Sequence, residues 1–214
     1  GPFDRPVSWL EDIMAFRPHG RPTERVRVNG VVTLNEPEYG AYIQQGPYGI
    51  LIQGRGLAKL KPGDQVDATG YEGISDNDSP MLRDVVVRPA AQTLYKSTGT
   101  PMIAQLWNEN HEGREVRVSG LVEQVERGLE WTSVILLEGN HRAWARMRTK
   151  ALDQPPAVGS VLSAKGVCHY THAPGLSRPT EVRVISRAEE DWRMVEPPPL
   201  ATRLKWGRIA LAVG

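Results

Sequence analysis

Cysteine and histidine, two common zinc ligands, stand close together near the end of the chain. Cys168 and His169 are neighbours, and His172 follows three residues later. A tetrahedral zinc site needs four converging ligands, or three ligands and a water molecule. On a β-strand, adjacent side chains point to opposite faces, so Cys168 and His169 do not easily share an ion. We therefore expect Cys168 to face a core, both histidines to lie near a loop, and no metal to bind.

Arginine and tryptophan alternate with small apolar residues in a second segment. As a β-strand, 142–148 has Ala143, Ala145 and Met147 on one face. The opposite face then carries Arg142, Trp144, Arg146 and Arg148. An aromatic ring among arginines is how some β-barrels bind single-stranded nucleic acid, and it also fits a protein-interface anchor. The simplest interpretation is a plain exposed face whose arginines pair with Glu123, Glu126, Glu130 or Glu138 on neighbouring strands.

Three tyrosines, Tyr39, Tyr42 and Tyr48, gather around the first predicted hairpins. A tyrosine at a barrel rim often packs by its ring and keeps its hydroxyl in water. Core or rim packing is the first interpretation, and a platform for a small molecule is the second. The candidate ligand-binding residues are thus Tyr42, Tyr48, Arg142, Trp144, Arg146 and Arg148.

The sequence contains no recognisable catalytic motif. There is no nucleophile elbow, no H-E-x-x-H pair, no Walker loop and no dinucleotide-binding fingerprint. The segment 76–79 resembles half of a calcium loop, but it lacks the glycine and the distal glutamate, so we interpret it as a solvated loop. The sequence predicts neither catalysis nor a bound cofactor.

The charge of the chain is nearly balanced. Its 26 lysines and arginines oppose 25 acidic residues, which gives a net charge of +1. A dedicated nucleic-acid binder usually has a strong basic excess, because phosphate neutralisation dominates its affinity. The balance argues against that role but leaves room for a local basic patch. Cys168 is the single cysteine, so no internal disulfide forms, and cysteine usage leaves the redox compartment open.

The elements that must position these residues come in two copies. The segment 26–32, VRVNGVV, reappears as VRVSGLV at 116–122. Further along, 63–70 is matched by 159–166, and 84–87 by 181–184. Three matching segments in the same order indicate two tandem copies of one domain, with longer loops in the second copy.

Each copy is predicted to be a short helix followed by five strands. The first helix opens with a capping box at Ser8 and Glu11, and the second covers 101–107 with Pro101 in its first turn. Period-2 alternation predicts the strands, and Gly30 is expected to mark a bulge or bend. Five strands bent at glycines are typical of the OB fold. The predicted fold is therefore all-β, with two tandem OB-fold-like five-stranded barrels, each preceded by a short α-helix.

The predicted organisation has five parts. They are a tag remnant and N-terminal helix (1–23), a first OB-like domain (24–90), a linker and short helix (91–111), a second OB-like domain (112–196), and a proline-rich exit with a juxtamembrane segment (197–214). Basic residues and Trp206 ahead of the apolar run 209–213 are typical of the start of a membrane-spanning helix, which needs about 20 apolar residues. An amphipathic tail packed on the second domain is the alternative.

These features match a known arrangement. It comprises 26–33, the aromatic strand 42–45, LKPGDQV at 60–66, the second-half segments 158–161 and 164–168, and the proline-rich exit. In these segments the chain resembles the tandem OB-like extracytoplasmic regions of bacterial sensor histidine kinases of two-component systems. One departure is QGPY at 45–48, where family members often carry an acidic and a small residue. The resemblance implies a periplasmic part of an inner-membrane protein, with the kinase half absent from this chain.

The resemblance also implies a function. The region would bind an unknown small molecule or protein signal and pass a domain rearrangement through 197–199 to a membrane helix. A homodimer formed through the membrane receptor is compatible with this function. The alternatives are a soluble OB-fold protein that binds single-stranded nucleic acid through the arginine and tryptophan strand, and a scaffold module that binds protein or glycan.

Overall fold

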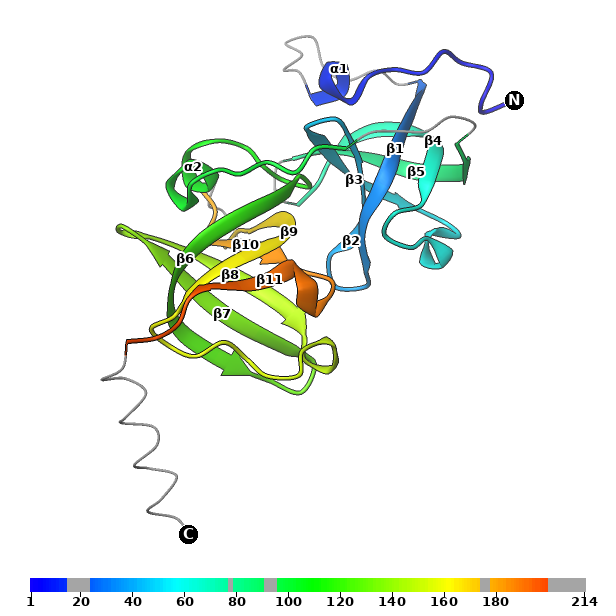
Figure 1. Ribbon diagram of the computed structural model, residues 1–214. Helices are drawn as coiled ribbons and strands as arrows, with labels where there is room; N and C mark the ends of the chain where they lie inside the picture. The colour runs from blue at the N-terminus through cyan, green and yellow to red at the C-terminus, as the bar shows by residue number, and fades with distance from the viewer. Residues whose placement is uncertain (15–23, 77–78, 91–95, 174–177, 200–214) are drawn as a thin grey trace. The chain divides into compact units, whose positions relative to one another are not determined.

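The computed structural model describes residues 1–14, 24–76, 79–90, 96–173 and 178–199 (Figure 1). Its contacts divide the chain into two compact units. The first unit contains Gly1–Gly99, Asn110–Val116 and Val167–Thr180, and the second contains Thr100–Glu109, Arg117–Gly166 and Glu181–Gly214. Residues 112–116 and 167–180, which the sequence assigns to the second domain, group with the first unit by their contacts.

Five strands of the first unit form a closed barrel in the order β1-β2-β3-β5-β4. They are β1 (Arg25–Glu36), β2 (Gly40–Gln45), β3 (Tyr48–Gly54), β4 (Gln65–Ile74) and β5 (Pro80–Pro89). β3 pairs with β5 in parallel, whereas β1 with β2, β1 with β4, β2 with β3 and β4 with β5 pair antiparallel. A five-stranded barrel with this order is the OB arrangement, so the predicted fold class is confirmed.

Alternate residues of these strands fill the first barrel. Val28, Ile43 and Ile50 are at most 1% exposed, as the period-2 pattern requires of a strand with one face in a core. The short helix α1 (Leu10–Met14) adds Leu10 and Ile13 to the same core. A 3-10 turn, η1 (Leu57–Lys59), follows β3.

The second half of the chain repeats this strand order. Its elements are α2 (Ile103–Asn108), β6 (Glu115–Arg127), β7 (Trp131–Glu138), β8 (His141–Arg148), β9 (Val161–Thr171), β10 (Glu181–Ile185) and β11 (Trp192–Glu196), with 3-10 turns η2 (Thr149–Ala151) and η3 (Glu189–Asp191). The sheet runs β10-β8-β7-β6-β9-β11, and a further pairing of β10 with β9 closes the ring. β8 pairs with β10 in parallel, as β3 does with β5. β11, which the sequence analysis did not predict, lies antiparallel beside β9.

The repeated sequence makes repeated backbone contacts. The N–H of Gly63 donates to the carbonyl of Val32 at 2.8 Å, and the N–H of Gly159 donates to that of Val122 at the same distance. Both glycines have a positive φ, 98° for Gly63 and 85° for Gly159. L side chains rarely adopt that conformation, so glycine is the residue that this turn needs in each copy.

The irregularity expected at Gly30 occurs slightly later in β1. The register of β1 against β2 shifts between Val32 and Leu34, and β6 shifts against β7 at the matching step. Gly30 itself marks a close approach, because a Cβ there would lie 3.1 Å from the carbonyl oxygen of Gln44. The bulge alternative for Gly30 is therefore corrected: the register shift lies between Val32 and Leu34, and Gly30 itself allows the neighbouring strand to approach closely.

Two sequence predictions fall outside the described residues. The basic and apolar segment 204–214 is one, and the centre of the acidic loop, residues 77–78, is the other. Among the helices in the described part of the chain, none has the length and apolar character needed to cross a bilayer.

Candidate functional site

β8 has the predicted two-sided pattern. Its inward side chains are completely buried, whereas the outward ones are partly or fully exposed, as alternation along a strand requires. The inward residues are Ala143, Ala145 and Met147, and the outward ones are Arg142, Trp144, Arg146 and Arg148. The four predicted residues therefore share one face of the second unit.

Apolar side chains of β6 and β7 continue this face. Ile135 is paired with Trp144, and Leu137 is paired with Arg142 on one side and with Leu121 on the other. Leu121 is 43% exposed, and Ile135 and Leu137 are partly exposed. Directly opposed residues of antiparallel strands lie within contact distance on one face. The result is an apolar row across three strands with arginines beside it.

Trp131 also belongs to this face, although the sequence analysis did not select it. The guanidinium carbon of Arg148 lies 4.1 Å from the Trp131 ring centroid, and that of Arg146 lies 5.0 Å from it. Trp131 is only 8% exposed because these two arginines cover it. The sequence did contain a signal for Trp131: it lies four residues before Ile135 on β7, and residues an even number apart on a strand share a face. We name this surface, formed by Trp131, Trp144, Arg142, Arg146 and Arg148, the arginine–tryptophan face.

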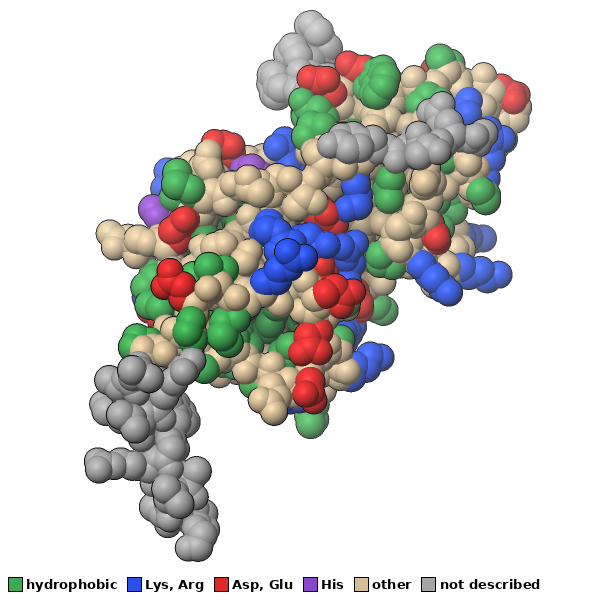
Figure 2. All heavy atoms as spheres, in the orientation of Figure 1, with side chains coloured by type: hydrophobic (Ala, Val, Ile, Leu, Met, Phe, Trp, Pro, Cys, Tyr) green, Lys and Arg blue, Asp and Glu red, His purple; other side chains and the backbone are tan. Residues whose placement is uncertain are grey.

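Glutamates pair with two arginines of the face, as the simplest interpretation predicted. Arg142 Nε donates to Glu123 at 2.6 Å, and Arg148 Nη1 donates to Glu130 at 3.0 Å. The hydrogen bond from Arg142 lowers the pKa of Glu123. The Glu130 side chain is 77% exposed, and exposed pairs of this kind contribute about 0–1 kcal/mol. Another anion can therefore displace Glu130 at little cost, whereas Glu123 accepts two hydrogen bonds from Arg142 and is held more firmly. Figure 2 shows basic and acidic side chains interspersed over the visible surface.

Tyr42, one of the two tyrosines predicted to bind a ligand, lies in the interior of the first unit. It is 1% exposed, and its hydroxyl donates to Glu112 Oε1 at 2.5 Å. His169 Nδ1 lies 3.1 Å from the same oxygen, and the Tyr39 ring meets the His169 ring edge-on at 5.0 Å. The hydroxyl was expected to stay in water, but Glu112 offers it a buried acceptor instead. Tyr42 thus presents almost no surface to a ligand.

Burial also makes the Cys168 thiol unreactive. The thiol is completely buried, as predicted, and burial raises its pKa, as does the nearby Glu112 carboxylate. A thiol held protonated in this way is a poor nucleophile. His169 contacts Tyr39 and Glu112, which both lie in turns, so its predicted place near a loop is confirmed. Within the described ranges, no group of three or more acidic, cysteine or histidine side chains is arranged to hold a metal ion.

Tyr48 stays at the rim of the first barrel. It is partly exposed, its ring packs on the barrel core, and its hydroxyl donates to Glu11 at 3.0 Å. The Arg114 guanidinium lies 5.4 Å from the centroid of the ring. Of the two predicted tyrosines, Tyr48 is the one that a ligand can reach.

Comparison with known proteins finds only distant structural likenesses. No family model and no curated protein matches the chain. One similar solved structure is a murine DNA-binding protein bound to double-stranded DNA, with a TM-score of 0.40, 8% identity, and coverage of 81% of this chain and 97% of that one. The chain has two OB-like barrels.

Two further similar structures are parts of larger proteins. A putative aspartyl-tRNA synthetase from Leishmania major Friedlin matches with a TM-score of 0.39 and 15% identity, over 51% of this chain and 23% of that chain. A replication protein A heterotrimer bound to single-stranded DNA matches with a TM-score of 0.36 and 11% identity, over 91% of this chain and 53% of that chain. Likenesses this distant carry no argument about what the chain binds.

Proposed function

We propose that the chain is a binding module that takes single-stranded nucleic acid on the arginine–tryptophan face. The observation that carries the proposal is the face itself. Trp144 is partly exposed beside Ile135, and Arg142 and Arg146 lie on the same side of the same strand. Single-strand binders on OB barrels combine an aromatic stacking platform with a groove of basic residues.

Each part of the face has a role in this proposal. A base stacks on Trp144, and the apolar row of Leu121, Ile135 and Leu137 receives the neighbouring base or sugar. Phosphates displace Glu130 from Arg148, because the Glu130 side chain is 77% exposed, and they compete with Glu123 for Arg142, whose side chain is 48% exposed. Since each displaced glutamate stays nearby, the net electrostatic gain is modest, and we expect moderate affinity.

Fluorescence anisotropy with labelled dT and rU oligonucleotides tests the proposal. We expect binding at about 50 mM salt that weakens at about 200 mM, because counterion release contributes to affinity. Replacing Trp144 with alanine should weaken binding by about tenfold, since one base–aromatic stack contributes roughly 1–3 kcal/mol. Trp9→Ala is the matched control, because Trp9 is 67% exposed in the first unit and should leave affinity unchanged. Absence of binding at low salt, or equal losses in both variants, would rule the function out.

A second candidate function is the extracytoplasmic sensing region of a bacterial membrane receptor. The resemblance to sensor histidine kinases suggests it, and the position of β11 favours it. This strand pairs with β9 and leads directly into Pro197–Pro199, a stiff segment through which a change in the sheet would pass along the chain. In this candidate the receptor lies in the inner membrane and the region in the periplasm.

A thermal-shift screen against metabolites, sugars and nucleotides tests the second candidate. A ligand specific for the native state stabilises it by RT ln(1 + [L]/Kd). A rise in Tm with one small molecule that persists at high salt supports sensing. A rise only with oligonucleotides, lost at high salt, contradicts it and supports the first candidate.

A further inference from the structure

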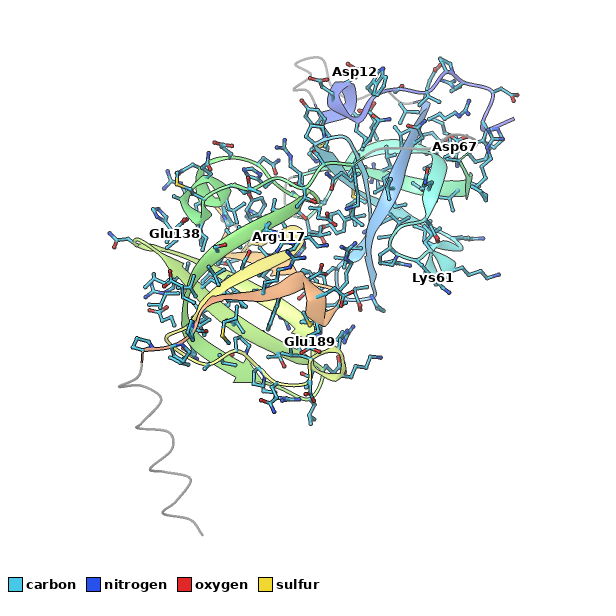
Figure 3. All side chains as sticks on the ribbon, in the orientation of Figure 1. Asp12, Lys61, Asp67, Arg117, Glu138 and Glu189 are labelled. Atoms are coloured by element: carbon cyan, nitrogen blue, oxygen red, sulfur yellow. The ribbon has the colours of Figure 1, made fainter. Side chains whose placement is uncertain are left out.

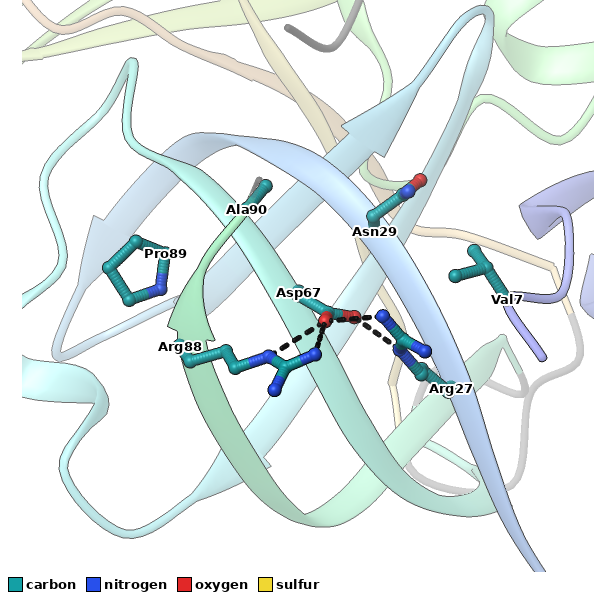
Figure 4. Close-up of a pocket in the computed structure, with 7 residues that line it drawn as sticks. All are labelled: Val7, Arg27, Asn29, Asp67, Arg88, Pro89 and Ala90. Atoms are coloured by element: carbon teal, nitrogen blue, oxygen red, sulfur yellow. Dashed lines mark hydrogen bonds and ion pairs between the residues drawn. The ribbon is translucent and has the colours of Figure 1, made fainter. Parts of the chain in front are cut away.

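A pocket on the first barrel is separate from the arginine–tryptophan face. Its volume is about 460 Å³, within the usual range for small-molecule sites. It lies over β1, β4 and β5, as Figure 4 shows. Its charged lining residues are Arg27, Asp67 and Arg88, and Asn29 is a further polar one. Its apolar lining residues are Val7, on the Arg27 side, and Pro89 and Ala90, on the other side of Asp67 (Figure 4).

Asp67 orients both arginines of the pocket. Arg27 donates to it twice, from Nε to Oδ1 and from Nη2 to Oδ2, each at 2.9 Å (Figure 4). Arg88 Nε donates to Oδ2, also at 2.9 Å. Burial by itself would raise the pKa of Asp67, but the hydrogen bonds from Arg27 and Arg88 outweigh burial and lower it. Asp67 is therefore ionised at neutral pH and holds the two guanidinium groups in fixed positions.

The two arginines differ in the donors they have left. Arg27 Nη1 donates to the carbonyls of Phe3 and Arg5, so most of its donors are used inside the protein. Arg88 directs Nε and Nη2 at Asp67, and among the described residues no acceptor is recorded for its Nη1. The Phe3 ring centroid lies 4.2 Å from the Arg88 guanidinium carbon and supports its face. Arg88 is thus held in place, is 48% exposed, and still has donors to offer.

The charge of the pocket selects the ligand class. The two guanidinium groups and one carboxylate that line the pocket carry one net positive charge, which matches a monoanion. The Asp4 carboxylate also acts on both arginines, and it is paired with the N-terminal amine. A dianion would bring a second negative charge towards Asp67 with only Arg88 to meet it. The apolar lining residues Val7, Pro89 and Ala90 lie on either side of these charges and suit a hydrocarbon body. We propose that this pocket binds a small organic monocarboxylate, with its carboxylate on Arg88 and its carbon body against Val7 and Ala90.

Benzoate is a suitable probe, and the arginine Nε–H signals in a ¹H–¹⁵N NMR spectrum are a direct readout. At constant ionic strength, benzoate should shift the Arg88 signal saturably, with a Kd on the order of 1 mM. Benzamide, which has the same shape without the charge, and inorganic phosphate should leave the signal unchanged. No saturable shift with benzoate, or an equal response to phosphate, would overturn the proposal.

Variants locate the binding. Arg88→Gln should weaken benzoate binding at least about tenfold, because a charge-assisted contact is lost. Arg55→Gln, the same change at an exposed arginine outside the pocket, should have no effect. Ala90→Leu narrows the pocket while leaving both arginines in place, so it also should weaken binding even if Arg88→Gln disturbs folding. Equal affinity in Arg55→Gln and Arg88→Gln would place benzoate elsewhere. Trp144→Ala should keep benzoate binding, which makes this test independent of the proposed function.

Discussion

Glu138 Oε2 accepts the backbone N–H of Ile103 at 2.6 Å, so the end of β7 is joined to the first residue of α2 (Figure 3). The first unit has the same connection, in which Leu10 at the start of α1 donates its N–H to Gln45 Oε1 at the end of β2. A glycine with positive φ follows each acceptor, Gly46 after Gln45 and Gly139 after Glu138. The duplication therefore preserves the attachment of each helix to its barrel, although the acceptor differs.

Substitution of Glu138 tests the hydrogen bond at the start of α2. Glu138→Ala should lower the free energy of unfolding by about 1–2 kcal/mol, because a helix N–H loses its partner. Glu138→Gln should restore most of this loss, because glutamine is the natural acceptor in the first unit. Urea denaturation measures both variants. Equal losses in the alanine and glutamine variants would mean that charge, and not the hydrogen bond, stabilises the connection.

The two tryptophans of the arginine–tryptophan face should differ in their contribution to stability. Trp131→Ala removes a ring that is only 8% exposed, and we expect a loss of about 3 kcal/mol. Trp144→Ala removes a partly exposed ring and should cost under about 1 kcal/mol. Thermal and urea unfolding of the two variants measure the difference. A large loss for Trp144→Ala would undermine its use as a binding-specific variant.

Asp67 should make the first unit sensitive to acid. Its pKa in the folded protein is lowered from 3.8 by Arg27 and Arg88, against the opposing effect of burial. The unfolded chain therefore takes up this proton first as the pH falls. The stabilisation is complete above about pH 4 and is lost as the pH falls through the folded-state pKa. Asp67→Asn should remove about 2 kcal/mol at neutral pH and flatten this acid dependence. An unchanged acid profile in Asp67→Asn would contradict the assignment.

Tyr42 should make stability sensitive to alkali. Burial and the Glu112 carboxylate raise its pKa well above 10.0 in the folded protein, so the unfolded chain loses this proton first. The contribution of Tyr42 is present below about pH 10 and declines as the pH rises further. Tyr42→Phe should cost about 1–3 kcal/mol at neutral pH, since Glu112 loses a donor, and should reduce the alkaline decline. Absorbance titration of tyrosinate in folded and urea-unfolded protein checks the late ionisation directly.

Local features of the fold could be predicted from the sequence because they depend on a few neighbouring residues. The turn glycines Gly63 and Gly159 need a backbone conformation that few residues adopt, and the alternation in 142–148 fixes which side chains face outward. Long-range partners were not predictable in the same way. Glu112 and Tyr42 are 70 residues apart, and no periodicity relates them.

The register in which the strands pair could not be predicted from the sequence either. Arg27 and Asp67 meet because β1 pairs with β4 so that Asn29 is opposite Asp67, and a shift by one residue would turn Asp67 to the other side of its strand. β11 was not predicted because it is short and follows an acidic turn. The candidate site on β8 was found because its signal is local, whereas the pocket on the first barrel depends on residues from three strands.

The first unit is discontinuous in the chain, and this has a consequence for synthesis. It needs residues 110–116 and 167–180, where Gly113 donates its N–H to the carbonyl of Cys168 at 2.9 Å and Cys168 donates to that of Arg114. Translation proceeds from the N-terminus, so a nascent chain that ends at residue 99 lacks these segments. The ribosome must release residue 180 before the first unit has all its parts. The closed barrel β1–β5 ends at Pro89, so all its strands are translated well before the two later segments that complete its unit.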